Sequence, residues 1–166
     1  HVADYYVDSV DEKKLYDMAI DGMLEKLNDP YTVFLHEREY RDLTFIIDHF
    51  AWATPGEARE SKVQAMESLA RFRNVHVKVS SLPLVSGSKP PEYEDLHPLI
   101  KRVHAAYGAE RLMWASDQTQ TMGKNRGTYV QNADIIRKYA AAYLPAADVQ
   151  MMMHGTAARV FSWPAE

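Results

Sequence analysis

The chain of 166 residues contains no cysteine, which excludes disulfides and thiolate metal sites and leaves the cellular compartment unknown. No apolar run approaches the ~18 residues that a membrane-spanning helix needs, so the sequence predicts no membrane partner. The 19 basic residues do not outnumber the 23 acidic ones, and the net charge is -4. Nucleic acid is therefore not an expected partner, because binding it depends on a basic surface that displaces counterions.

The chain also lacks an initiator methionine and begins His1-Val2-Ala3 without a charged and apolar leader. This beginning is typical of a processed or excised piece. The composition, with 46% hydrophobic and 25% charged residues, is that of a globular protein. Its length allows one ordinary domain, or one domain with a small helical appendage.

Residues 1–43 have the pattern of a helical segment. Asp11 is a plausible N-cap, and apolar residues recur after it at steps of three and four. Asn28-Asp29-Pro30 ends the pattern, because proline cannot continue a helix and restricts the residue before it. A second short helix is expected at 37–43. The apolar positions of the first helix are Leu15, Met18, Ala19, Met23, Leu24 and Leu27.

From Thr44 onward, short apolar runs alternate with helical patterns. Strands are expected at 45–47, 75–79 and 111–115, and a polar loop at 80–92. Helices are expected from Thr54 to about 72, from about 93 or 96 to 107, and near 129–142 and 154–161. This alternation predicts an α/β fold with three parallel βα units after an N-terminal helical segment. The predicted domains are residues 1–43 and 44–166.

Polar residues follow each predicted strand, and in parallel α/β folds ligands gather at the carboxyl ends of strands. His49, Lys78 and Asp117 are the candidates at the three ends. His49 and Asp117 are suited to ligate a divalent metal, or to act as acid and base on an activated water. Simpler interpretations remain: a hydrogen-bonded strand-end histidine, a loop-capping aspartate and a solvated lysine. His154 is a second candidate ligand.

Four segments after residue 44 together resemble the amidohydrolase-related family of TIM-barrel hydrolases and decarboxylases. The segments are Ile46–Phe50, Asn74–Leu82, Tyr107–Asp117 and Gly155–Phe161. Their order and spacing resemble the last three strands of that barrel and its closing helix, over about residues 45–163. The resemblance therefore implies a partial TIM barrel.

The resemblance also implies roles for the two strongest candidates. Asp117 matches the acidic residue after the last strand, which is a metal ligand or the proton acceptor for the attacking water. His49 matches the histidine after the sixth strand, which polarises substrate or ligates the metal. Gln118-Thr119 departs from the Trp-Pro that the family often has there.

The first 35 residues resemble a different family, the carboxyl-terminal processing serine proteases. Tyr5–Asp8, Leu15–Leu24 and Leu27–Leu35 are similar to the N-terminal helical segment of that family, which supports oligomer packing and contains no catalytic residue. The chain is therefore interpreted as a chimera joined near Leu43-Thr44.

Two functions remain open at this stage. A full barrel takes about 250 residues, and no His-x-His metal pair, which the family's first strand normally supplies, occurs in the sequence. One hypothesis is a hydrolase-derived site, weak or inactive, acting on a carboxylate or lactone and binding zinc or manganese weakly or not at all through Asp117 and His49. The other is a non-catalytic module that forms a homo-oligomer through open sheet edges.

Overall fold

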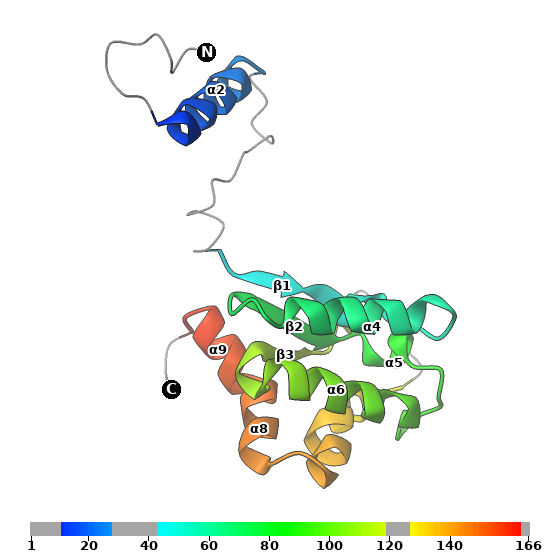
Figure 1. Ribbon diagram of the computed structural model, residues 1–166. Coiled ribbons are helices and arrows are strands. Elements are labelled where there is room, and N and C mark those ends of the chain that lie inside the picture. The colour runs from blue at the N-terminus through cyan, green and yellow to red at the C-terminus, as the bar shows by residue number, and fades with distance from the viewer. Residues whose placement is uncertain (1–10, 28–42, 119–126, 164–166) are drawn as a thin grey trace, which may run out of the picture. The chain divides into compact units, whose positions relative to one another are not determined.

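The computed structural model describes residues 11–27, 43–118 and 127–163 (Figure 1). The chain separates into two compact units, His1–Leu43 and Thr44–Glu166, and each is described by itself. No helix among the described residues is long and apolar enough to cross a membrane.

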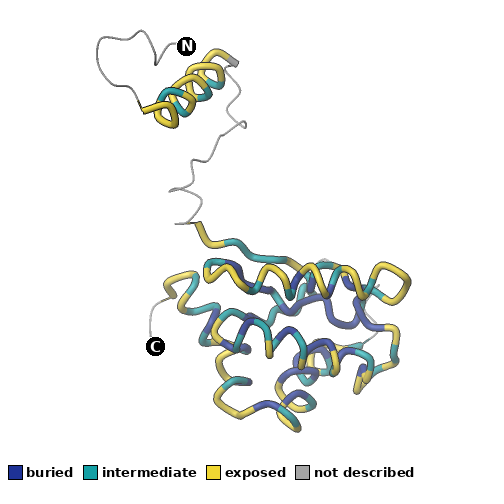
Figure 2. The backbone as a smooth tube through the Cα atoms, viewed as in Figure 1, coloured by how far each residue is buried: buried dark blue, intermediate teal, exposed yellow. Residues whose placement is uncertain are grey.

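The first unit contains helix α2, Glu12–Leu27. The carboxylate of Asp11 accepts hydrogen bonds from the backbone N–H groups of Lys13, at 2.9 Å, and Lys14, at 3.4 Å, so the predicted N-cap is confirmed. No described side chain of α2 is buried (Figure 2). The second short helix predicted in this unit lies outside the described residues, apart from Leu43.

The second unit is built on a sheet of three parallel strands, β1 (Phe45–Ile47), β2 (Val75–Ser80) and β3 (Leu112–Ala115), in the order β1-β2-β3. In register, Ile47 lies opposite Val77, and Val77 lies opposite Leu112. The predicted α/β class with parallel βα units is therefore confirmed. Since β2 is central, its side chains are buried on both faces, as parallel sheets require (Figure 2).

Helices α4 (Ala58–Leu69) and α6 (His97–Tyr107) lie side by side over one face of the sheet (Figure 1). Arg102 of α6 joins them through hydrogen bonds of 2.8–3.0 Å to the carboxylates of Glu60 and Glu67 on α4. Gly108 ends α6 at φ +71, a backbone angle that glycine adopts without strain. The largest fully buried side chains are Tyr93, Tyr107, Phe50, Met66, Leu82, Leu96, Ile100, Leu112, Met113, Ile135, Ile136 and Met152.

The remaining elements are short and follow the strands or close the unit. Thr156 ties the last helix to the segment before β3, because its hydroxyl donates to the carbonyl of Ala109 at 2.8 Å. The helix at Leu82–Val85 lies inside the predicted polar loop, so that loop is partly helical. These elements are η1 (Asp48–Trp52), α5 (Leu82–Val85), η2 (Glu94–Leu96), η3 (Ala109–Arg111), α7 (Tyr129–Asp134), η4 (Ile135–Tyr139), η5 (Ala140–Ala142), α8 (Ala146–Gln150), η6 (Met151–Gly155) and α9 (Thr156–Val160).

His76 is buried in β2 and is only 5% exposed. Desolvation lowers the pKa of His76, and the positive charges of Arg159 and Arg111 lower it further. The Asn74 backbone opposes this shift, although neither ring nitrogen forms a hydrogen bond of normal geometry within the described residues. Burial in β2 therefore favours the neutral form of this imidazole.

Candidate active site at the strand ends

The backbone turns into the left-handed region just beyond each of the three strands. His49 has φ +47, Ser81 has φ +54 and Asp117 has φ +51. A non-glycine residue in this conformation costs about 1–2 kcal/mol. Such strain persists only where the surrounding structure enforces it, and it is concentrated at functional sites. The three strand ends are therefore the first place in this unit to look for a site.

The turn after β1 is the most unusual of the three. Four successive residues, His49–Trp52, have φ between +47 and +53. Phe50 lies in the middle of this turn, and its side chain is completely buried in the core. Burial of an aromatic side chain stabilises by about 2–3 kcal/mol. The core thus holds the turn in place while the imidazole of His49 remains 22% exposed.

The turns bring together the two residues that the strand ends predict as a pair. Nδ1 of His49 lies 3.6 Å from Oδ2 of Asp117, and the Asp117 side chain is 12% exposed. They come from the ends of β1 and β3, which do not pair directly. A separation of 3.6 Å is too long for a direct hydrogen bond and short enough for one bridging group or water to serve both.

Two serines at the end of β2 fill the space between them. Oγ of Ser80 and Oγ of Ser81 each lie 3.0 Å from Nδ1 of His49. Ser81 also donates its hydroxyl proton to Oδ2 of Asp117. Both serines are completely buried. The polar groups of all three strand ends therefore form one connected network.

The other ring nitrogen of His49 faces a charged pair. Nε2 lies 3.3 Å from Oδ2 of Asp48, and Oδ1 of Asp48 lies 2.6 Å from Nζ of Lys78. The Lys78 side chain is 31% exposed, which agrees with a solvated lysine. It also joins the network through Asp48, where its positive charge balances a carboxylate that is 50% exposed.

This arrangement fits acid–base chemistry better than a complete metal centre. A catalytic zinc usually has three protein ligands and one open position. Within the described residues, no three His, Asp or Glu side chains are placed to hold a metal ion. His49 and Asp117 supply two ligands at most, and Asp48 is engaged by Lys78. An imidazole and a carboxylate 3.6 Å apart, with the Ser81 hydroxyl against both, are residue types that can act together as acid and base on one substrate or one water.

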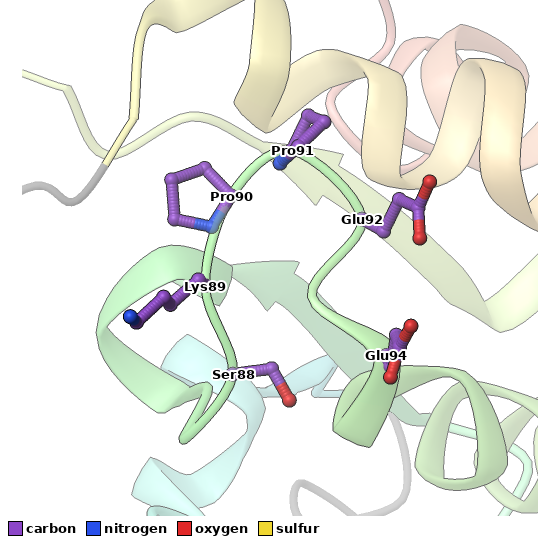
Figure 3. A pocket seen from close by; sticks show the side chains of 6 residues that line it. All are labelled: Ser88, Lys89, Pro90, Pro91, Glu92 and Glu94. Carbon is purple, nitrogen blue, oxygen red and sulfur yellow. The ribbon is translucent and has the colours of Figure 1, made fainter.

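Another hollow in this unit, of about 270 Å³, lies away from these residues (Figure 3). It is formed by the loop between α5 and η2, and its walls are Ser88, Lys89, Pro90, Pro91, Glu92 and Glu94. Neither His49 nor Asp117 lines it. Its charged groups are the carboxylates of Glu92 and Glu94 and the ammonium of Lys89, and none of the lining residues is buried.

The sequence indicates part of this site and misses part of it. Spacing after the strands identifies His49 and Asp117, which the structure brings within reach of one another. It does not identify Ser81 or Asp48, although each lies next to a predicted strand end. Ser81 is missed because serine is uncommon at positive φ and no sequence pattern predicts that conformation.

A parallel sheet with polar groups converging at its carboxyl edge is the arrangement in which α/β folds, βα-barrels included, place their ligand sites. The profile of the family described as amidohydrolase matches residues 33–163. The chain therefore belongs to the amidohydrolase family. The profile of the activating protease CtpB N-terminal domain matches residues 1–39, so the predicted combination of two unrelated segments is confirmed.

Two curated proteins are similar to the two segments. L-fucono-1,5-lactonase of Burkholderia ambifaria is 32% identical over 110 residues, which cover 66% of this chain and 37% of that protein. Carboxy-terminal processing protease CtpB of Bacillus subtilis is 38% identical over 47 residues, which cover 28% of this chain and 10% of that protein.

A solved amidohydrolase of Burkholderia multivorans has the same fold over most of the chain. Its HEPES-bound crystal form gives a TM-score of 0.66 at 22% identity, covering 76% of this chain and 47% of that one. Its zinc-bound form gives 0.64 at 22% identity. The chain thus spans less than half the length of the amidohydrolases it matches.

Proposed function

We propose that the Thr44–Glu166 unit is a hydrolase segment whose strand ends activate a water for attack on a lactone or a related carboxylate ester. Asp117 accepts the proton of the water, and His49 polarises the substrate carbonyl or protonates the leaving oxygen. The observation that carries this proposal is the 3.6 Å approach of Nδ1 of His49 to Oδ2 of Asp117. Similarity to a lactonase supports the substrate class.

The expected activity is low. A complete barrel of this type takes about 250 residues and gathers catalytic groups from several strands. Within the described residues three strands contribute, so substrate binding and the stabilisation of developing charge rest on few groups. The acid–base pair alone is expected to supply a rate increase of about 10²–10⁴.

Lactone hydrolysis measured on the intact chain tests this proposal. We expect slow opening of aldono-lactones, followed by acid release, that falls at least tenfold in Asp117→Ala and in His49→Gln. His104→Gln is the matched control, because His104 pairs with Asp148 at 2.8 Å away from the strand ends. Equal rates in the protein, both site variants and the control would refute the proposal.

Zinc or manganese binding is expected to be weak, because Asp117 and His49 provide two ligands and a stable site needs more. Calorimetric titration with each metal is expected to show binding that disappears in Asp117→Ala. An equal heat of binding in Asp117→Ala and in the unchanged protein would mean that the metal binds at another site.

A second candidate function rests on the sheet edges. Within the described residues, β1 and β3 each pair on one side only. Helix α2 also exposes large apolar side chains, with Tyr16 67%, Met18 63% and Met23 62% accessible. Unpaired edges and exposed apolar surface both favour association with another chain. We therefore propose that copies of this chain form a homo-oligomer.

Sedimentation at micromolar concentration tests this association. We expect a species heavier than the 19.0 kDa chain, and we expect Ile46→Lys to return it to the monomer, because an edge lysine opposes strand pairing. Gln64→Lys, on the exposed side of α4, is the matched control. A single monomer at all concentrations would contradict the proposal.

A further inference from the structure

Ser81 lies at the only point where the two proposed reacting groups are joined within the described residues. Nδ1 of His49 and Oδ2 of Asp117 are 3.6 Å apart, beyond hydrogen-bond distance. The Ser81 hydroxyl closes this gap, because it donates to Oδ2 of Asp117 and lies 3.0 Å from Nδ1 of His49.

The direction of the first hydrogen bond determines the second. A serine hydroxyl has one proton and two lone pairs. Since Ser81 gives its proton to Asp117, only a lone pair remains for His49. A hydrogen bond between His49 and Ser81 therefore needs a proton on Nδ1 of His49. Ser80 lies at the same distance from Nδ1, and its hydroxyl can either donate to this nitrogen or accept from it.

The backbone of Ser81 indicates that this position of the hydroxyl is enforced. Ser81 has φ +54 and ψ +24 at the junction of β2 and α5, a conformation that serine rarely adopts. Its side chain is completely buried. A residue held in a strained conformation with its polar atom between two titratable groups is the pattern of a preorganised site.

We propose that Ser81 is a positioning residue that holds the His49 imidazole and the Asp117 carboxylate together and makes Nδ1 the donor nitrogen of His49. Its importance for hydrolysis rests on the function proposed above.

Nuclear magnetic resonance of the imidazole nitrogens tests the proposal without any activity. In a long-range ¹H–¹⁵N spectrum at pH 8, with His49 assigned by its loss in His49→Gln, we expect a protonated Nδ1. In Ser81→Ala we expect the proton to move to Nε2, which faces Asp48 at 3.3 Å. Ser80→Ala is the matched control and is expected to retain the protonated Nδ1. An unprotonated Nδ1 in the unchanged protein, or no change in Ser81→Ala, would overturn the proposal.

Ser81→Gly keeps the test decisive if the alanine variant does not fold. Glycine adopts positive φ without strain, so Ser81→Gly is expected to unfold at a higher denaturant concentration than Ser81→Ala. Both variants lack the hydroxyl. It should show the same proton shift as Ser81→Ala. An unchanged Nδ1 in Ser81→Gly would assign Ser81 a backbone role only.

Kinetics separate this proposal from the proposed function. If the chain opens lactones, Ser81→Ala is expected to lower kcat about tenfold with KM little changed, because the hydroxyl acts on the acid–base pair and not on substrate binding. If no lactone is hydrolysed, the proposed function fails, while the nitrogen spectra still decide the role of Ser81.

Discussion

Replacing Asp95 with alanine is expected to lower the free energy of unfolding by about 3 kcal/mol. Its carboxylate pairs with Arg59 at 2.8 Å and is 23% exposed. It also accepts a hydrogen bond from the Ser86 hydroxyl, and others from the backbone N–H groups of Gly87 and Ser88 at 2.9 and 3.2 Å. Asp95 therefore fixes the loop that follows α5, and its removal leaves Arg59 without its carboxylate.

Urea unfolding followed by tryptophan fluorescence measures this effect in the correct unit, because Trp52, Trp114 and Trp163 all lie within Thr44–Glu166. Glu94→Ala is the matched control: its exposed side chain is adjacent to Asp95, and we expect a change within ~0.5 kcal/mol. Equal effects of the two substitutions would contradict the proposed role of Asp95.

The same carboxylate makes stability depend on acid. Desolvation raises the pKa of Asp95, but hydrogen bonds from Ser86, Gly87 and Arg59 outweigh it and hold that pKa well below the ordinary 3.8. Below about pH 4, Asp95 therefore binds a proton in the unfolded chain but stays ionised in the folded chain. Stability contributed by Asp95 is present above that pH and is lost as the pH falls. In Asp95→Ala this part of the acid dependence should disappear.

Arg111→Ala is the second substitution with a large expected effect, also about 3 kcal/mol. Its guanidinium donates to the carbonyls of Tyr107, Ala70 and Phe72 at 2.8–3.1 Å, and to that of Ala106 at 3.2 Å. These carbonyls lie at the ends of α4 and α6, where helices leave acceptors unpaired. One side chain thus joins both helix ends to the start of β3.

Arg111→Lys distinguishes shape from charge in this interaction. Lysine keeps the positive charge but lacks the planar set of five donors, so we expect it to recover less than half of the loss in the same urea experiment. Arg137→Ala provides the control, since Arg137 is 60% exposed in its pair with Asp134. Full recovery by lysine would mean that charge alone is responsible.

The fold is predictable from the sequence where one local pattern decides the structure. The three strands lie within one residue of their predicted bounds, because each is an apolar run too short for a helix and is bounded by helical patterns. The helix at Leu82–Val85 is not predicted, since its serine- and proline-rich surroundings indicate a loop. Proline near the first turn, here Pro83, is compatible with a helix and with a loop. Tertiary packing therefore decides which of the two forms.

The candidate site is predictable only as far as the strand-end rule extends. That rule places His49 and Asp117 at one edge of the sheet, and the 3.6 Å between them agrees with it. The rule does not predict Ser81, because the place of this serine in the site depends on its contacts with His49 and Asp117, which only the structure reveals. It also does not pair Lys78 with Asp48, since that contact depends on the left-handed turn after β1.

The left-handed turn after β1 has a consequence for how this chemistry can be adjusted. His49 reaches Asp117 because the ring of Phe50, one residue away, is buried in the core. The spacing of the proposed acid–base pair is therefore tied to the volume available to one aromatic ring. Natural or designed change among the apolar neighbours of Phe50 can tune reactivity while every polar group stays as it is.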